Sequence, residues 1–329
     1  MPTLNNKNTP LLEIRNLSVE FSTYNGTAKV LENVRLNLQA GEILGLVGET
    51  GCGKSVLARS ILNLIPQPPG RTTSGEVFFK GVDLRKISNR QMRSIRGNEA
   101  SMIFQEPMSS LNPVFTVGSQ MTELVHLHQG IGKKQARDLC VDMLRQVQMP
   151  DPEQIIKKYP HELSGGMRQR VMIAMELSCK PSLLIADEPT TALDVTIQGQ
   201  VLTILTNLAR RDNIAILLIT HDMGVVAQVC DRVAVMYAGK IVEVAPVREL
   251  FAHSAHPYTS GLIGSIPGQN TIEKKELTSI PGRVPSLINP PCGCRFHTRC
   301  SKRLEMCERL DPCFFHIGEH HEVACHLYQ

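Results

Sequence analysis

The segment GETGCGKS, Gly48–Ser55, is the strongest indication of the fold class of this chain. The run from Glu42 to Val47 before it has the composition of a buried strand, and residues 56–65 after it, VLARSILNLI, are apolar at helical spacing. A strand, a glycine-rich loop and a helix in this order form a phosphate-binding loop, because glycines let consecutive backbone N–H groups curl around a phosphate at a helix N-terminus. The predicted phosphate-binding residues are Gly48, Glu49, Thr50, Gly51, Cys52, Gly53, Lys54 and Ser55.

Four side chains predict the chemistry at this loop. Lys54 should neutralise the β- and γ-phosphates of a nucleotide, and Ser55 should ligate Mg²⁺. The segment LLIADE ends in Asp187 and Glu188 at the carboxyl end of a buried strand, where open α/β sheets bind ligands. Taken alone, two carboxylates there could equally begin the next helix. Beside a phosphate loop they predict that Asp187 holds Mg²⁺ and that Glu188 orients and deprotonates the attacking water of ATP hydrolysis.

Composition limits the class of protein. A chain of 329 residues with 42% hydrophobic content can bury a large core. Its formal charge of +4 is too small to indicate a nucleic-acid partner, and we expect none. Because the sequence has neither a long apolar run nor a secretory signal at its start, we expect a cytosolic protein that meets a membrane through a partner.

The pattern of apolar residues predicts an α/β fold. The alternating stretches Leu12–Phe21 and Val34–Leu38 predict strands of an N-terminal antiparallel sheet. The continuous apolar runs Leu183–Ala186 and Ile214–Ile219 predict parallel strands covered on both faces, with a helix at Val201–Arg211 between them.

Further elements complete this prediction. We expect strands at Val233–Tyr237 and Lys240–Val244. Between about residues 84 and 160 the pattern turns helical, most clearly at Lys133–Val147. We interpret this part as a helical insert.

The motif LSGGM, Leu163–Met167, narrows the class of nucleotide hydrolase. With Gln105 in FQEP, Asp194 in TALD and His221 in ITHD, it completes a set of motifs in the order typical of ABC ATPases. The chain resembles this family from about Leu12 to Tyr258. The resemblance implies a P-loop NTPase fold with an N-terminal antiparallel β subdomain, a helical insert and, here, a C-terminal cysteine-containing extension.

The resemblance also implies how nucleotide is held. In this family two ATPase domains sandwich two nucleotides head to tail, and each signature segment completes the partner's phosphate loop. Ser164, Gly165 and Gly166 would therefore present the start of a helix to a γ-phosphate of the partner. Gln105 would sense metal and water, and His221 would contact the γ-phosphate. The implied catalytic residues are Glu188, His221 and Gln105, the implied Mg²⁺ residues are Ser55, Gln105 and Asp187, and Asp194 joins the nucleotide site.

An aromatic residue upstream of the phosphate loop should stack on the adenine ring. Phe21 ends the first predicted strand, where this family usually has its stacking aromatic, and we predict that it does so here. Tyr24, three residues later in a polar turn, is the alternative, and a core role for Phe21 also remains open.

The C-terminal part resembles one branch of the family. HPYTSGL at residues 256–262 and IPGRVPSLINPP at residues 280–291 are similar to the tail of dipeptide and oligopeptide importer ATPases, as are FQEPMSSLNP and DEPTTALDVTIQ. We therefore predict an ABC ATPase domain over residues 1–258, with a helical subdomain at about 84–160, and a C-terminal extension over residues 259–329.

The extension is rich in cysteine. Four cysteines stand with five, six and seventeen residues between them, and matching positions in some relatives bind a 4Fe-4S cluster: Cys294, Cys300, Cys307 and Cys325. Zinc or unligated thiols remain open, because Cys292 and Cys313 do not belong to that pattern. The tail histidines His316, His320, His321 and His326 are interpreted as solvated.

These observations predict the ATP-binding and ATP-hydrolysing subunit of a membrane ABC importer for dipeptides or oligopeptides. The resemblance implies a paralogous ATPase as dimer partner, two transmembrane permease subunits, an extracytoplasmic substrate-binding protein, and a place on the cytoplasmic face of the bacterial inner membrane. A homodimer and a nickel or metal-chelate cargo remain alternatives. A soluble ABC ATPase acting on nucleic acid or ribosomes fits less well, because the phosphate loop and signature are separated only by a compact insert.

Overall fold

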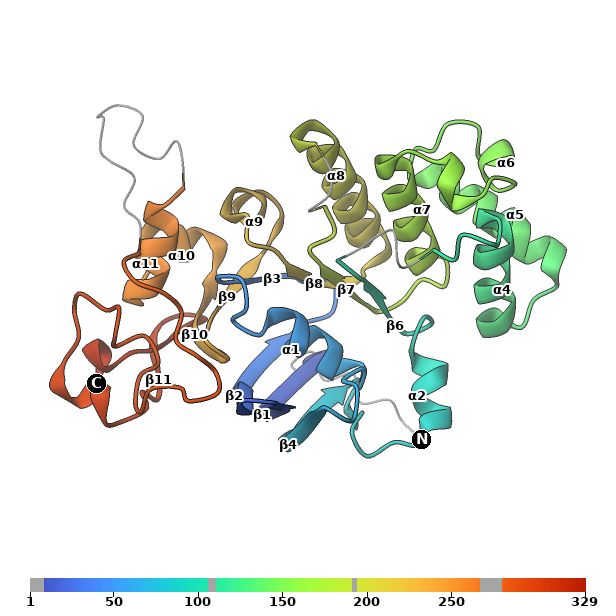
Figure 1. Cartoon of the computed structure of the whole chain (residues 1–329). Helices are drawn as coiled ribbons and strands as arrows, with labels where there is room; N and C mark the ends of the chain where they lie inside the picture. Colours follow the sequence, from blue (N-terminus) through green and yellow to red (C-terminus); the bar gives the residue numbers. More distant parts are fainter. Residues whose placement is uncertain (1–8, 106–110, 191–193, 267–279) are drawn as a thin grey trace, which may run out of the picture. The chain divides into compact units, whose positions relative to one another are not determined.

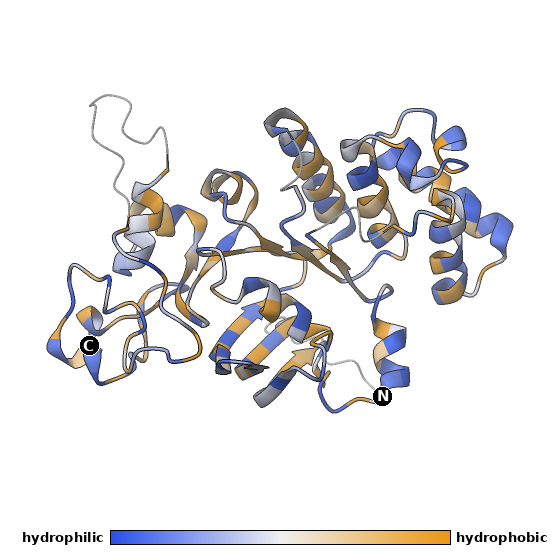
Figure 2. Cartoon of the chain, viewed as in Figure 1, coloured by the Kyte–Doolittle hydropathy of each residue, from blue (hydrophilic) through white to orange (hydrophobic). Residues whose placement is uncertain are grey.

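The computed structural model describes residues 9–105, 111–190, 194–266 and 280–329 (Figure 1). Half of the quoted FQEPMSSLNP segment, residues 106–110, and the first three residues of TALD, residues 191–193, lie outside the described residues. Hydrophobic residues concentrate on the central strands, for example on β3 (Ile43–Val47), of which every residue is buried (Figure 2). No helix among the described residues is both long and apolar enough to cross a bilayer.

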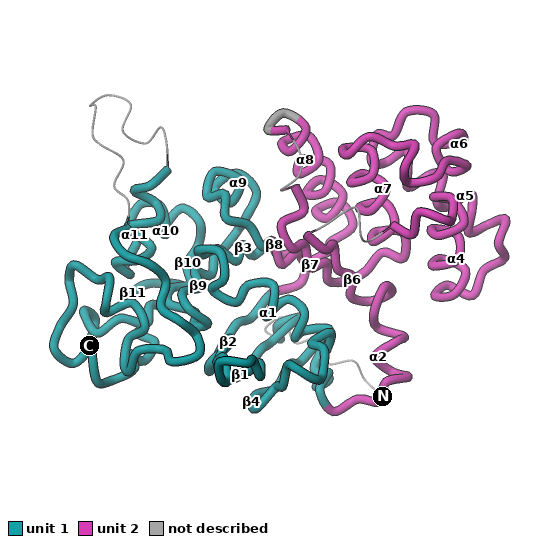
Figure 3. The backbone as a smooth tube through the Cα atoms, viewed as in Figure 1, with its two compact units in different colours: residues 1–38, 43–85, 219–329 teal, residues 39–42, 86–218 magenta. Residues whose placement is uncertain are grey.

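The chain divides into two compact units (Figure 3). The first contains residues 1–38, 43–85 and 219–329, and the second contains residues 39–42 and 86–218. The C-terminal extension thus belongs to the same unit as the phosphate loop. The domain boundary that we placed at residue 259 stays a prediction.

An antiparallel sheet lies in the first unit. Its strands are β1 (Leu12–Thr23), β2 (Gly26–Leu38), β4 (Gly70–Phe79) and β5 (Val82–Asp83), in the order β2-β1-β4-β5. Leu12 pairs with Leu38 on one side and with Phe79 on the other, and all three side chains are buried. The predicted N-terminal antiparallel sheet is confirmed, and β4, which we did not predict, is its third strand.

Five strands of a second sheet lie in this unit, in the order β11-β12-β10-β9-β3. β3 pairs in parallel with β9 (Arg232–Tyr237), and β10 (Lys240–Pro246) pairs antiparallel with β9. β11 (Phe314–Gly318) and β12 (His321–Ala324) come from the cysteine-rich tail and add two strands that we did not predict. The helices of this unit are α1 (Lys54–Ile61), α9 (Met223–Val229), α10 (Val247–Ala252) and α11 (Pro257–Gly264).

The second unit combines parallel strands with helices. Its strands follow the order β8-β7-β6, with β6 (Ala100–Ile103), β7 (Leu183–Asp187) and β8 (Ala215–Ile219). The helices are α2 (Asn89–Ile95), α4 (Val117–Gln129), α5 (Lys133–Gln146), α6 (Pro152–Ile155), α7 (Gly165–Leu177) and α8 (Val195–Asp212). The predicted strands and helices of this part are confirmed, and β6 lies within the insert that we predicted as helical.

Helix α5 shows why the insert folds. Ala136, Cys140, Val141 and Leu144 recur at intervals of three or four residues and are buried, so they form one apolar stripe. This helix contacts both α4 and α7. The helices therefore bury their apolar faces against each other.

Candidate functional site

The phosphate loop follows β3 and depends on its glycines. Gly48, Gly51 and Gly53 have φ angles of 153°, 81° and 109°, a region that side chains disfavour. A Cβ at Gly48 would lie 2.1 Å from the carbonyl oxygen of Met236, so this position has no room for one. A Cβ at Gly51 would meet no described atom within 4 Å. The loop is therefore tightly packed at its ends and open at its middle.

The side chain of Lys54 folds back onto the phosphate loop. Lys54 is the first residue of α1, is 6% exposed, and its Nζ donates to the carbonyl oxygens of Gly48 at 2.7 Å and Glu49 at 3.1 Å. The helix is capped by Gly53, which has no side chain to bind the N–H groups of the first turn. A buried ammonium group and the positive end of a helix thus lie together, an arrangement that can bind phosphate.

In the second unit, the structure brings Gln105 and Glu188 together. β6 and β7 are parallel neighbours, with Ile103 paired to Ala186, so the residues that follow these strands emerge side by side. Gln105 Nε2 donates to Glu188 Oε2 at 3.0 Å, which leaves the Gln105 Oε1 as an oxygen that a cation could use. Asp187 ends β7 and is buried.

The backbone of Glu188 has a left-handed conformation with a φ of 48°. Such a conformation is uncommon for a residue with a side chain and is found preferentially at functional sites. Directly after a buried strand, it turns the chain and determines where the carboxylate points.

The signature segment begins α7. Ser164 accepts a hydrogen bond from the N–H of Met167 at 3.3 Å and so caps the helix. A Cβ at Gly166 would lie 3.1 Å from the side chain of Ile197, so α8 approaches this glycine closely. The segment therefore presents the start of a helix with small residues, as its predicted role requires.

Two further predicted residues stand where helices begin. Asp194 is the N-cap residue of α8 in the second unit and is exposed. His221 comes after the end of β8, belongs to the first unit and is exposed. The next residue, Asp222, caps α9 by accepting hydrogen bonds from the N–H groups of Gly224 and Val225. The structure thus places the phosphate loop and His221 in one unit, and Gln105, Asp187, Glu188, the signature segment and Asp194 in the other.

The two aromatic candidates for adenine stacking differ in exposure. Phe21 lies in β1, is partly buried, and would be 3.0 Å from a Cβ placed on Gly70 of β4. Tyr24 lies in the following turn and is fully exposed. Their roles stay predictions.

Four cysteines of the extension interact electrostatically. Burial, together with the neighbours Cys307, Cys325 and Cys300, raises the pKa of Cys294 to about 11. All ten cysteines lie among the described residues, and none of them forms a disulfide. Among the described residues, however, no three His, Cys, Asp or Glu side chains are grouped so that they could hold a metal ion. The structure therefore gives the predicted 4Fe-4S cluster no support.

Two tail histidines are not solvated, and our interpretation of them was wrong. His321 is buried and its Nε2 lies 2.8 Å from Oε1 of Glu243, a carboxylate with no exposed surface. His326 is also buried and contacts the carbonyl oxygen of Leu310. β12, the strand that contains His321, pairs with β10, so the contact of His321 with Glu243 joins the extension to that strand.

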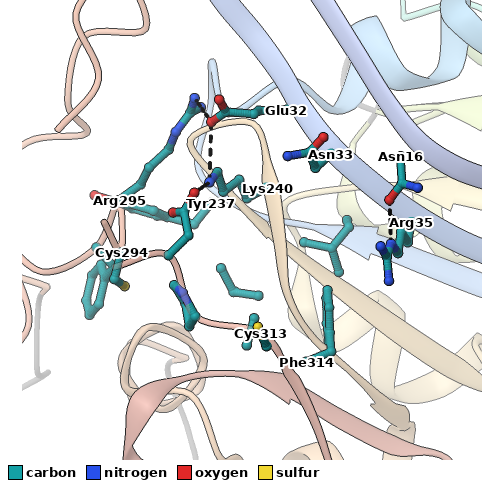
Figure 4. A pocket seen from close by; sticks show the side chains of 16 residues that line it. Asn16, Glu32, Asn33, Arg35, Tyr237, Lys240, Cys294, Arg295, Cys313 and Phe314 are labelled. Carbon is teal, nitrogen blue, oxygen red and sulfur yellow. Dashed lines mark hydrogen bonds and ion pairs between the residues drawn. The ribbon is translucent and has the colours of Figure 1, made fainter. Parts of the chain in front are cut away.

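A cavity of about 420 Å³ lies beside this cysteine region (Figure 4). Its lining includes Glu32, Lys240 and Arg295, and both cations pair with the carboxylate of Glu32. None of the residues predicted to bind nucleotide lines it. This cavity is therefore distinct from the phosphate loop.

Two residues that we did not assign to the site contact the phosphate loop directly. The hydroxyl of Tyr258 accepts a hydrogen bond from the N–H of Glu49 at 2.8 Å, and Arg299 forms an ion pair with the Glu49 carboxylate at 2.6 Å. Tyr258 belongs to the HPYTSGL segment, whose resemblance was the available signal. For Arg299 the sequence held no comparable signal.

Comparisons with known proteins show the family to which the chain is similar. The family model described as "ABC transporter" matches residues 31–191, and the model described as "Oligopeptide/dipeptide transporter, C-terminal region" matches residues 242–307. A probable peptide ABC transporter ATP-binding protein of Sinorhizobium fredii is 50% identical over 315 residues, which cover 96% of this chain and 94% of the relative. A dipeptide transport ATP-binding protein of Bacillus subtilis is 48% identical over 317 residues, again covering 96% and 94%. A dimeric ATP-binding cassette solved with ADP and phosphate has the same fold, with a TM-score of 0.65, 24% identity, and coverage of 72% of this chain and 99% of that one.

Proposed function

This chain belongs to the ABC transporter ATP-binding proteins of the dipeptide and oligopeptide transport family, and on that basis we propose that it energises the import of dipeptides or oligopeptides by hydrolysing ATP. Similarity over nearly the whole chain supports this, because it includes both the cassette and the C-terminal region named for peptide transporters. The observation that carries the proposal is the phosphate loop, where Lys54, three left-handed glycines and the start of α1 converge.

Binding of ATP is assigned to the loop residues Gly48–Ser55. The loop N–H groups and the positive end of α1 would hold the phosphates, and Lys54 would exchange the carbonyls of Gly48 and Glu49 for phosphate oxygens. Ser55, Gln105 and Asp187 offer hydroxyl, amide and carboxylate oxygens, which suit Mg²⁺, and a bound Mg²⁺ would supply charge neutralisation at the phosphates. Phe21 would stack on adenine.

Hydrolysis is assigned to Glu188. Its hydrogen bond with Gln105 and its left-handed backbone hold the carboxylate in a defined direction. A carboxylate so held can orient a water molecule and accept its proton. His221 would contact the γ-phosphate and so distinguish ATP from ADP.

The working unit is proposed to be a dimer in a membrane complex. Ser164, Gly165 and Gly166 would bind the γ-phosphate held by a partner ATPase, and Asp194 would line the same interface. The dimeric cassette of similar fold is compatible with this proposal. The partner is proposed to be a paralogous ATPase, with two permease subunits and an extracytoplasmic binding protein completing a complex at the cytoplasmic face of the inner membrane.

The 4Fe-4S cluster remains a proposal that depends only on the sequence spacing of Cys294, Cys300, Cys307 and Cys325. Four thiolates are the donor set that such a cluster requires. Anaerobic purification followed by iron and zinc analysis and visible absorbance spectroscopy tests it. A colourless protein without iron would rule it out.

The transport proposal is tested in vesicles that contain the ATPase, its permease subunits and its binding protein. ATP hydrolysis should increase when dipeptides or oligopeptides are added and should not respond to nickel chelates. Glu188→Gln should retain ATP binding but lower turnover at least about 100-fold, because general-base catalysis contributes about 10² to 10⁴. Stimulation by a nickel chelate alone would replace the peptide assignment, and normal turnover of Glu188→Gln would remove Glu188 from the mechanism.

A further inference from the structure

Glu49, the second residue of the phosphate loop, is held from three directions. Its N–H donates to the hydroxyl of Tyr258 at 2.8 Å, and its carbonyl oxygen accepts from Lys54 at 3.1 Å. Its carboxylate receives both ends of the Arg299 guanidinium, at 2.6 and 3.0 Å. One residue thus connects the phosphate-binding lysine to two side chains of the C-terminal part of the chain, 209 and 250 positions away.

The hydroxyl of Tyr258 has a fixed position. Its ring is fully buried and packs edge-on against Tyr237, at 4.6 Å between ring centroids, and at a tilt against Phe296, at 5.4 Å. It stands in the first turn of α11, whose N-cap His256 accepts a hydrogen bond from the Tyr258 N–H. Rigid packing of this kind places the hydroxyl without further loss of side-chain entropy, so its bond can hold a loop in one conformation.

Arg299 is fixed equally well. Its side chain is only 5% exposed, and besides Glu49 it donates from Nε to the carbonyl oxygen of Pro281 at 2.9 Å. The bond to Glu49 raises the pKa of Arg299 further above its ordinary range. A guanidinium that binds both oxygens of a carboxylate fixes direction as well as distance.

We infer that Tyr258 and Arg299 are positioning residues of the nucleotide site, through which the C-terminal part of the chain sets the conformation of the phosphate loop and so the affinity for ATP. The loop must present its N–H groups in one arrangement, and Glu49 precedes the open glycine Gly51 by two residues. Releasing Glu49 would let the loop sample other conformations, and each loss of preorganisation weakens ligand binding. This inference depends on the proposed ATP-binding function.

The test uses full-length protein and compares the dissociation constant of a fluorescent ATP analogue with Mg²⁺, together with KM and kcat for ATP hydrolysis. Tyr258→Phe removes only the hydroxyl, and we expect about fivefold weaker binding, the equivalent of one hydrogen bond. Arg299→Gln should weaken binding about tenfold or more, because it removes a charge-assisted pair. KM should rise in both variants more than kcat falls, since the loop binds phosphate before and during hydrolysis.

Two matched control variants remove a tyrosine hydroxyl and an arginine guanidinium from the same C-terminal part of the chain. Tyr328→Phe deletes a hydroxyl that donates to the carbonyl oxygen of Ala255 instead of contacting the loop. Arg295→Gln removes a buried arginine whose carboxylate partner, Glu32, lies on β2. Both should bind the ATP analogue within about twofold of wild type.

If Arg299→Gln does not fold, Glu49→Gln tests the same ion pair by removing the charge of its other partner. Arg299→Lys should keep only part of the wild-type affinity for the ATP analogue, because an ammonium cannot bind both carboxylate oxygens at once. Wild-type affinity in Tyr258→Phe and Glu49→Gln, or an equal loss in the two controls, would overturn the inference. Failure of the wild-type protein to bind the analogue would instead overturn the proposed function with it.

Discussion

Glu243 of β10 should be among the most sensitive positions for the stability of the first unit. Its carboxylate has no exposed surface and accepts three hydrogen bonds: from the N–H of Ala255 at 2.7 Å, from the N–H of His256 at 2.9 Å, and from Nε2 of His321 at 2.8 Å. It therefore ties β10 both to the segment that starts α11 and to β12. Through α11 it also supports Tyr258.

The substitution Glu243→Gln keeps the shape of this side chain but replaces one acceptor oxygen by an NH₂ group that faces donors. At least one buried donor then has no acceptor, which costs about 1 to 3 kcal/mol, and the remaining bonds lose their charge assistance. We expect the free energy of unfolding to fall by about 3 kcal/mol.

Urea unfolding followed by circular dichroism measures this change, because the chain has no tryptophan to serve as a fluorescent probe. Glu249→Gln is the matched control: its carboxylate is more than half exposed and, within the part of the chain that the structure describes, pairs with the exposed His253, so a loss of about 0.5 kcal/mol or less is expected. A loss below about 1 kcal/mol in Glu243→Gln would show that the three bonds do not hold the extension in place.

Three further predictions concern the loop, a partly buried acid and the adenine contact. Gly48→Ala should abolish binding of a fluorescent ATP analogue in a titration, because its Cβ would collide with the Met236 carbonyl; binding within about tenfold of wild type would contradict the loop geometry. Burial raises the pKa of Glu176 from 4.5 to about 7, so the free energy of unfolding of the wild type should fall as pH rises through this window. In thermal unfolding experiments, Glu176→Gln should be more stable than wild type by about 1 to 2 kcal/mol at about pH 8 and by little at about pH 5. An equal gain in stability at the two pH values would refute this prediction. Phe21→Ala should weaken the analogue's affinity about fivefold or more while Tyr24→Ala does not, as isothermal titration can show, and the reverse result would transfer the stacking role to Tyr24.

Strong local patterns made most of the fold predictable. Buried parallel strands such as β7 and β8 are continuous apolar runs, and the glycine loop and α1 follow β3 in the order that phosphate binding requires. β12 could not be predicted in this way. Its four residues pair with β10 and β11, and the buried His321 contacts Glu243, a partner 78 positions away.

Some residues of the candidate site could likewise be predicted from local sequence patterns, and others could not. Residue types at fixed spacing predicted Lys54 and Glu188, whereas the contact of Gln105 with Glu188 depends on β6 lying next to β7. Tyr258 and Arg299 reach Glu49 only because the C-terminal part folds back into the unit that contains the loop. Contacts between distant positions leave no periodic trace in a sequence.

We propose that the loop around Lys54 binds the phosphates of ATP. Equilibrium binding of ATP with Mg²⁺ to the full-length protein, compared with Lys54→Ala, tests it most directly. We predict saturable binding by the wild type and a loss of about 100-fold or more in the variant, since a buried cation that contacts phosphate contributes about 3 kcal/mol. Equal affinity of the two proteins, or no binding by either, would contradict the account.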